Sequence, residues 1–288
     1  MKVTLLATLI VSSALLSACT TTTGSNSDAT KALTNKEKAV AVLNSIESGN
    51  SKAISYINSS HYTQHNLAVG DGLAGFGEVL QALPKGSAKV KVVRAFEDGN
   101  YVFTQTDYNF FGPKVGFDVF RFDKGLIVEH WDNLITKADK PNPSGHTQLD
   151  GVLTVTDLDK TAENKALVSD FVNTVLVKGE YQKMSQFFDG DNYIQHNPAI
   201  ADGLSGLGKA IDEMAQHGIK MTFTKVHKVL GEGNFVLTIS EGEFAGKATS
   251  YYDLFRVENG KIAEHWDVME TILPKSEWKN TNGKFGNL

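Results

Sequence analysis

Cysteine is almost absent from this chain. Of its 288 residues only Cys19 is a cysteine, which excludes an intrachain disulfide and a metal site built from several cysteines. The His-Glu-x-x-His signature of zinc hydrolases is missing as well. No Ser or Cys nucleophile stands in a recognisable arrangement with a base. The sequence therefore predicts neither a metal centre nor a covalent hydrolase.

Excess positive charge and long apolar runs are also lacking. The formal net charge is −5, and an acidic chain without a basic patch argues against nucleic acid as a partner. The apolar stretch from Val3 to Leu16 spans about fourteen residues, whereas a membrane-spanning helix needs roughly 20. With 41% hydrophobic and 21% charged residues, the composition is that of an ordinary globular protein.

The N-terminus reads as a secretory signal, because a short basic start precedes the apolar stretch and small residues follow it. Leu16–Cys19 resembles the bacterial lipobox, which implies lipidation of Cys19; the alternative is an ordinary signal peptide with an incidental cysteine. We expect a signal peptide over 1–18 and a disordered tether over 19–33. The resemblance implies a lipid-anchored protein of the bacterial cell envelope. Thr20 favours the outer membrane, facing the periplasm, if the source is Gram-negative.

The chain contains an internal repeat. Tyr62–Gly75 and Tyr193–Gly206 are identical at nine of fourteen positions, and Glu129–Asp132 recurs unchanged as Glu264–Asp267. Chance does not produce such agreement twice in the same order. The sequence therefore predicts a tandem duplication in which each half carries the same kind of site.

Each half changes from helical to strand periodicity along its length. Thr34 and Glu37 have the spacing of a capping box, and we expect helices from there to Gly49, over 51–58 and over 73–83. Strands are expected over 88–97, 100–110, 114–123 and 127–135, and again over 221–230, 234–243, 248–257 and 262–272. Helices followed by an antiparallel meander indicate an α+β domain. We expect domains at 34–136 and 162–275, a linker at 137–161 with a short strand at 152–155, and a tail at 276–288.

Two motif groups together resemble the SnoaL-like branch of the nuclear transport factor 2-like superfamily. They are Tyr-x-Gln-His-Asn followed by Asp-Gly, and Asp-x-Phe-Arg followed by Glu-His-Trp-Asp. The resemblance implies two tandem cone-shaped domains, each with helices packed on a strongly curved antiparallel sheet that surrounds a pocket. The family includes aldol-type polyketide cyclases, epoxide hydrolases and steroid isomerases, and its cyclases use no cofactor.

The resemblance also implies roles for particular residues. A pocket aspartate on a late strand is the general acid/base of the cyclases, which corresponds to Asp132 and Asp267. His130 and His265 share their strand faces with these aspartates, because side chains alternate along a strand. The expected ligand-binding residues come from the two copies of the first motif: Tyr62, Gln64, His65, Asn66, Tyr193, Gln195, His196 and Asn197.

Structural alternatives remain open for these residues. His65 and His196 can line the pocket or pin the loop by binding backbone carbonyls. Asp132 and Asp267 can be acid/base groups or fixed hydrogen-bond acceptors. Trp131 and Trp266 are expected to pack on a sheet face, and Asp71 and Asp202 to start helices. Gln105 and Ile239 stand near positions where relatives often carry a histidine, a departure that weakens the case for catalysis.

The leading hypothesis is an envelope protein with two pockets for a small organic molecule and cofactor-free catalysis of the aldol cyclase, isomerase or hydrolase type. The alternative is a non-catalytic module that binds a ligand or a protein. Domains of this superfamily commonly pair through their sheets. A tandem repeat can form that pair within one chain, so the sequence predicts a monomer in solution.

Overall fold

Each repeat places its helices before a meander of four antiparallel strands. The computed structural model describes residues 32–84 and 86–288, so the expected signal peptide, Cys19 and nearly all of the tether lie outside the described residues. In this part of the chain no helix is long and apolar enough to cross a membrane. The first repeat contains α1 (Asn35–Ser48), α2 (Ser51–Ile54), β1 (Thr63–Gln64), α3 (Gly72–Ala82), β2 (Lys89–Asp98), β3 (Tyr101–Asn109), β4 (Pro113–Asp123) and β5 (Leu126–Thr136).

The second repeat follows the same order, which confirms the predicted α+β class. Its elements are α4 (Thr161–Phe171), a π-helical segment (Val172–Val177), β6 (Ile194–Gln195), α5 (Gly203–Gln216), β7 (Met221–Glu232), β8 (Phe235–Phe244), β9 (Lys247–Glu258) and β10 (Lys261–Thr271). Short 3-10 helices lie at Leu158–Lys160, Tyr181–Gln186 and Lys275–Glu277. The two five-stranded sheets have the orders β1-β5-β4-β3-β2 and β6-β10-β9-β8-β7.

Local sequence explains most element boundaries. Thr34 and Glu37 form the predicted capping box, and Gly49 ends α1 with a φ of 66° that favours glycine. The second helix was expected to reach Asn58 but ends at Ile54, because Ile57 instead makes a β-bridge with Ile127. The predicted strand at 152–155 is wrong. The backbone amide of Val152 donates to a carboxylate and its carbonyl accepts from an arginine, so no strand ladder forms.

Strand register brings the two motif groups of each repeat together. The short strand β1 runs parallel to β5 and sets Gln64 beside His130. In the second repeat β6 runs parallel to β10 and sets Gln195 beside His265. Across the antiparallel pair β9–β10, Asp253 lies directly opposite Asp267. Segments about seventy residues apart in the sequence thus form one site.

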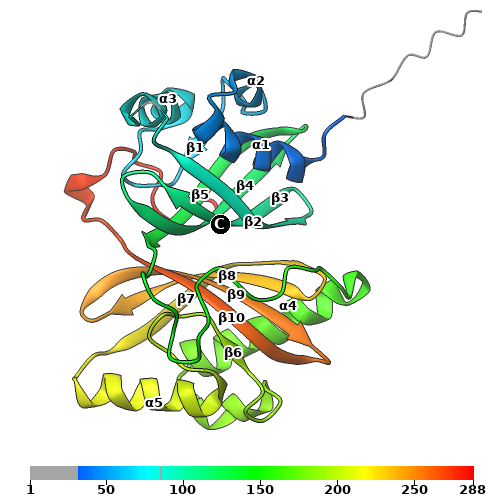
Figure 1. The fold of residues 1–288 in the computed structure, drawn as a ribbon, viewed down its shortest axis with the longest axis vertical. Coiled ribbons are helices and arrows are strands. Elements are labelled where there is room, and N and C mark those ends of the chain that lie inside the picture. Colours follow the sequence, from blue (N-terminus) through cyan, green and yellow to red (C-terminus); the bar gives the residue numbers. More distant parts are fainter. Residues whose placement is uncertain (1–31, 85) are drawn as a thin grey trace, which may run out of the picture. The chain divides into compact units, whose positions relative to one another are not determined.

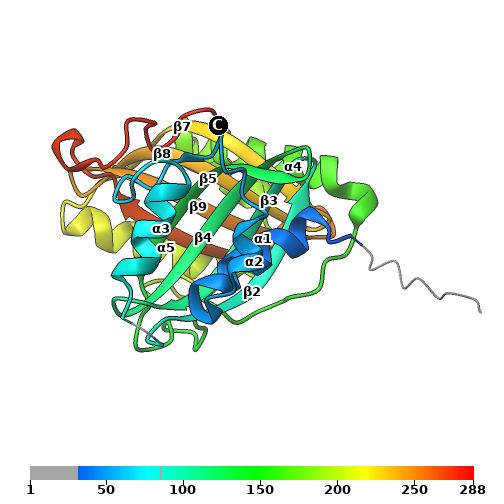
Figure 2. The same cartoon turned by 90° about the horizontal axis from the view of Figure 1, so that it is seen from above.

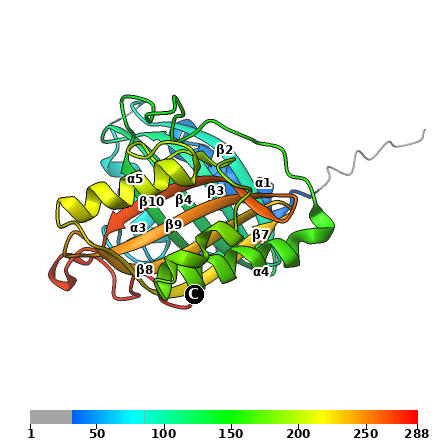
Figure 3. The ribbon, with the colours of Figure 1, turned by 90° about the horizontal axis from the view of Figure 1, so that it is seen from below.

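Each sheet has a helix-covered face and a second apolar face. Helices α1 and α3 cover the first sheet, and α4 and α5 cover the second (Figures 1 and 3). The second faces share one core, in which Trp131 and Trp266 are almost fully buried. The Asn133 side chain also donates to the carbonyls of Ser250 and Val268. This confirms that the tryptophans pack on a sheet face, here within a core common to both repeats. Seen from above, the first sheet lies over the second (Figure 2).

The segments that follow β5 and β10 each contact the opposite repeat. The amide of Asn142 donates to the carbonyls of Gln195 and Ile200 at 2.6 and 2.9 Å. Near the C-terminus, Asn280 donates to the carbonyls of Asn66 and Val69 at 2.8 and 3.0 Å. We call 142–151 and 280–288 the crossing segments. Each one covers the Tyr-x-Gln-His-Asn motif of the other repeat.

Candidate active site

A chain of polar side chains, most of them buried, connects the two motif groups in the second repeat. The Gln195 amide donates to the Tyr193 hydroxyl at 3.1 Å. The Gln195 oxygen lies 3.1 Å from His265 Nδ1, and His265 Nε2 lies 3.0 Å from Asp253 Oδ1. The first repeat has the same chain, formed by Tyr62, Gln64, His130 and Asp118.

The backbone fixes the direction of these hydrogen bonds. Gln195 Oε1 accepts from the backbone N–H groups of His196 and Asn197, both at 2.9 Å, so it is an acceptor for His265 as well. His265 Nδ1 therefore carries a proton and donates it. His265 Nε2 faces the Asp253 carboxyl, so His265 connects Gln195 to Asp253 through its two ring nitrogens.

Asp267 is the best candidate for a base. Its Oδ2 accepts from Asn197 Nδ2 at 2.7 Å, while Asn197 Oδ1 accepts from the Ala199 amide at 2.9 Å. Burial raises the pKa of the Asp267 carboxyl and Asp253 adds to this, although His265 opposes the shift. A carboxylate of raised pKa accepts a proton more readily at neutral pH than an ordinary one.

Tyr193 can donate a hydrogen bond into the same space. Burial, together with the charges of Asp267 and Asp253, keeps its pKa well above the ordinary value, so the hydroxyl stays protonated. Its oxygen already accepts from Gln195, which leaves the O–H free to act as a donor. A donor beside a base is what stabilisation of a developing oxyanion requires.

The motif histidines lie on the opposite face of the sheet from the aspartates. His65 Nε2 lies 2.8 Å from Glu129, and its ring stacks on Trp131 at 4.8 Å. His196 has the same contacts, with Glu264 at 2.8 Å and Trp266 at 4.6 Å. The expectation that these histidines share a pocket with the aspartates is therefore wrong, because the strand alternation that turns Trp131 away from Asp132 also separates the histidine from it.

The other nitrogen of each motif histidine binds a crossing segment. His65 Nδ1 lies 2.6 Å from the carbonyl of Gly283, and His196 Nδ1 lies 2.8 Å from that of Thr147. This is the geometry of the loop-pinning alternative. Burial raises the pKa of Glu264, but the hydrogen bonds from His196 and Arg256 lower it by more, so the net shift is downward. The Glu264 carboxylate that binds His196 is therefore ionised.

The structure also places four further residues that the sequence singled out. Gln105 binds Arg94 and Ile239 belongs to the core between the sheets, so the histidine missing from these positions would not have faced Asp132 or Asp267. Asp71 and Asp202 precede α3 and α5 but make no side-chain capping bond. Asp202 instead accepts from the Gln195 amide at 2.9 Å and so fixes the motif.

Sequence reasoning missed the aspartates on β4 and β9. Asp118 and Asp253 were seen as parts of a motif, but they were given no role. The signal was available, because pairing the two last strands of each repeat in an antiparallel hairpin sets each of them opposite the predicted acid/base. Their partners beyond the hairpin could not be predicted.

The two repeats differ in how far the histidine and the candidate base on β5 and β10 are exposed to solvent. In the first repeat His130 and Asp132 are 8% and 5% exposed. In the second repeat His265 and Asp267 are both only partly buried. The second site is therefore the more accessible of the two.

Two groups of side chains among the described residues have the composition of metal ligands. They are Asp118, His130 and Asp132, and His146, Asp150 and His196; the candidate ligand atoms within each group lie within 4.8 Å of one another. In the first group His130 Nε2 already binds Asp118. In the second, His196 Nδ1 binds the crossing segment. Either group could hold a divalent cation only after these bonds are broken.

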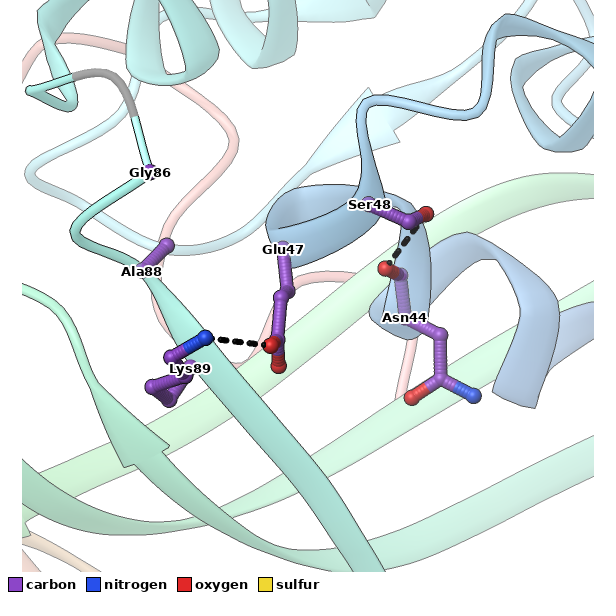
Figure 4. Close-up of a pocket in the computed structure, with 6 residues that line it drawn as sticks. All are labelled: Asn44, Glu47, Ser48, Gly86, Ala88 and Lys89. Atoms are coloured by element: carbon purple, nitrogen blue, oxygen red, sulfur yellow. Dashed lines mark hydrogen bonds and ion pairs between the residues drawn. The ribbon is translucent and has the colours of Figure 1, made fainter.

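Two cavities in the described part of the chain lie away from these aspartates. One, of about 390 Å3, is lined by α1 and the start of β2, with the Lys89–Glu47 ion pair at its edge (Figure 4). The other, of about 300 Å3, lies between Asp107, Lys137, Pro198 and residues His146–Leu149 of the crossing segment 142–151. Neither contains a group of the polar chain described above.

Solved structures similar to parts of this chain include proteins of several activities. An NTF2-like protein of unknown function from Cytophaga hutchinsonii is 16% identical, with 37% of this chain and 94% of that chain covered and a TM-score of 0.32. IdmH from Streptomyces antibioticus, a proposed polyketide cyclase, is 15% identical over 35% and 92%, with a TM-score of 0.32. An LEH-like epoxide hydrolase of M. tuberculosis is 19% identical over 38% and 85%, with a TM-score of 0.32.

Comparison with curated proteins gave no match. The family model of the SnoaL-like domain matches residues 168–265. The matched residues extend from α4 to the middle of β10 and include the whole polar chain of the second repeat. The second repeat is therefore similar to a SnoaL-like domain, as the motifs had indicated.

Proposed function

We propose that the second repeat binds a small organic molecule on its helix-covered face, and that Asp267 moves a proton to or from it without a cofactor. The reaction would be of the aldol cyclase, isomerase or hydrolase type. In each of these a base removes a proton from carbon or water while a donor stabilises the developing oxygen charge. Asp267 is the base and the Tyr193 hydroxyl is the donor.

The environment of Asp267 carries this proposal. Asp267 has a raised pKa, a fixed orientation through Asn197 and a protonated phenol nearby. A carboxylate that only served structure would be expected to have its charge satisfied by cations or several N–H groups, as Glu264 is by Arg256 and His196. Perturbed carboxylates without such partners gather at functional sites.

Proton abstraction can be tested without knowing the substrate. We expect the purified protein to catalyse hydrogen–deuterium exchange at carbons next to the carbonyl group in some members of a panel of small ketones, followed by proton NMR in D2O. Asp267→Asn should lower the exchange rate at least 100-fold, since general-base catalysis contributes roughly that much. Asp212→Asn removes an exposed carboxylate of α5 and controls for the change in charge.

The outcomes separate the two candidate functions. Exchange that Asp267→Asn abolishes supports the enzyme. Binding of panel members in a thermal-shift assay without any exchange would support the non-catalytic ligand-binding module instead. Exchange at an unchanged rate in Asp267→Asn would refute the assignment of this base. Asp132→Asn measures the share contributed by the first repeat.

We also propose that Cys19 is lipidated and anchors the protein in the cell envelope, on the support of its sequence context alone. Mass spectrometry of the protein isolated from bacterial membranes tests this. The proposal expects an N-terminal cysteine carrying acyl chains, and in Cys19→Ser a protein released from the membrane fraction. An unmodified N-terminus beyond residue 19 would contradict it.

A further inference from the structure

The two repeats exchange the positions of a tyrosine and a glycine. On the first sheet Tyr108 of β3 lies next to Gly116 of β4, and a Cβ on Gly116 would approach the tyrosine ring to 3.1 Å. In the second repeat the matching residues are Gly242 of β8 and Tyr251 of β9. The aromatic ring therefore comes from the neighbouring strand in each case.

This exchange changes which side chain binds the carboxylate that pairs with the histidine, Asp118 in the first repeat and Asp253 in the second. In the first repeat the Tyr108 hydroxyl donates to Asp118 Oδ2 at 2.6 Å, and Thr104 Oγ1 lies 3.4 Å from the same oxygen. Because His130 binds Oδ1, both oxygens of the Asp118 carboxylate have partners. The first repeat thus fills this position with a phenol of its own.

In the second repeat the tyrosine hydroxyl is directed elsewhere. Tyr251 stacks on Phe223 and donates to the carbonyl of Glu243 at 2.9 Å. Gly242 cannot be replaced by a residue with a side chain without rearrangement, since a Cβ there would lie 1.8 Å from the carbonyl oxygen of Thr222. No side chain of the chain takes over the hydrogen bond that Tyr108 makes in the first repeat, as far as the described residues show.

Three buried polar atoms on this face of the second repeat are without partners. They are Asp253 Oδ2, Thr238 Oγ1 and Ser240 Oγ. Thr238 and Ser240 are completely buried and Asp253 is 5% exposed. The corresponding face of the first repeat has one such atom, Asp132 Oδ1. Buried polar groups in native proteins nearly always have a partner, and each one left without a partner costs about 1–3 kcal/mol.

We propose that these three atoms form a subsite for a hydroxyl group of the ligand, and that this subsite exists in the second repeat alone. A hydroxyl group donates once and accepts through two lone pairs. It can donate to Asp253 Oδ2 and accept from Thr238 and Ser240, which matches the three atoms one for one. An anionic group is disfavoured there by the charges of Asp253 and Asp267. The ligand class is therefore an alcohol or a phenol.

The first repeat serves as an internal reference for this assignment. There a phenol hydroxyl occupies the position equivalent to the subsite, with a hydrogen bond of 2.6 Å to the carboxylate. His265 and Asp267 are more exposed than His130 and Asp132, so the second repeat has more contact with solvent at this site than the first. The inference rests on the proposed small-molecule site but is narrower than it, because that site could bind a ligand without any hydroxyl group.

The probe for this subsite is 4-methylphenol, which is the tyrosine side chain as a free molecule. Its matched control is toluene, which lacks the hydroxyl. We expect 4-methylphenol to bind the full chain with one site in ligand-observed NMR, at least tenfold more tightly than toluene. Ser240→Ala and Thr238→Val should each reduce this preference roughly two- to tenfold, since each removes one hydrogen bond. Asp253→Asn should abolish it.

Other outcomes would overturn the proposal. Equal affinity for the two probes, or a preference that survives both Ser240→Ala and Thr238→Val, would exclude a hydroxyl subsite even if Asp253→Asn failed to fold. If neither probe binds while the ketone exchange depends on Asp267, the subsite is wrong and the proposed function stands. If exchange fails but the hydroxyl preference follows Ser240, the subsite stands and the assigned chemistry is wrong.

Discussion

Each crossing segment binds the opposite repeat through an asparagine as well as through a motif histidine. Replacing Asn280 by alanine tests the share of the asparagine. Its side chain is 5% exposed. It donates to the carbonyls of Asn66 and Val69 at 2.8 and 3.0 Å and accepts from the Asn282 amide at 3.1 Å. Three hydrogen bonds at about 1 kcal/mol each give a loss of about 2–4 kcal/mol in unfolding free energy, including the cost of the carbonyls left unpaired.

Urea denaturation followed by tryptophan fluorescence measures this loss. Asn142→Ala should cost a similar amount, because Asn142 makes the equivalent bonds to the second repeat. Asn44→Ala changes an exposed asparagine of α1 and should stay within about 0.5 kcal/mol of the wild type. An Asn280→Ala protein that is as stable as Asn44→Ala would contradict a stabilising role for the Asn280 hydrogen bonds.

Three further predictions concern the polar networks and the assembly. Tyr108→Phe removes the hydroxyl that binds buried Asp118 and should lower the unfolding free energy by about 1–3 kcal/mol in thermal or urea unfolding. Tyr251→Phe should lower it less, because the bond of Tyr251 to Glu243 is only part-buried. The reverse order would contradict the assigned network. The pKa of Glu264 is lowered from 4.5, so its contribution to stability is present above pH 4.5 and is lost as the pH falls through the lower folded value. Glu264→Gln should therefore flatten the acid limb of the stability–pH curve, and an unchanged limb would count against an ionised Glu264. The apolar core shared by the two sheets predicts a monomer in gel filtration, and a clear dimer peak would refute the prediction.

Periodicity and turn residues predicted the long helices and the four-stranded meanders, but not the short strands β1 and β6. Strand alternation placed His130 with Asp132 and turned Trp131 to the other face, and the capping box at Thr34 located the start of α1. These are local signals, because each depends on residues a few positions apart. The internal repeat added the symmetry of the two halves without any structural information.

The contents of the site depended on contacts that local patterns do not encode. His65 follows Gln64 directly, yet the short parallel strand and the crossing segment turn it toward Glu129. The crossing segments looked like a linker and a tail, because their contacts are made with the opposite repeat. The tyrosine–glycine exchange concerns two neighbouring strands, so it becomes meaningful only once their register is known.

The pKa of Asp267 tests the central claim most directly. A titration of the side-chain carboxyl carbons by 13C NMR, with the Asp267 signal assigned through Asp267→Asn, gives this value in the folded protein. The account predicts a midpoint above the ordinary 3.8, because burial and Asp253 disfavour the charged form. A midpoint at or below 3.8 would show that Asp267 is an ordinary acceptor and would contradict its assignment as the base.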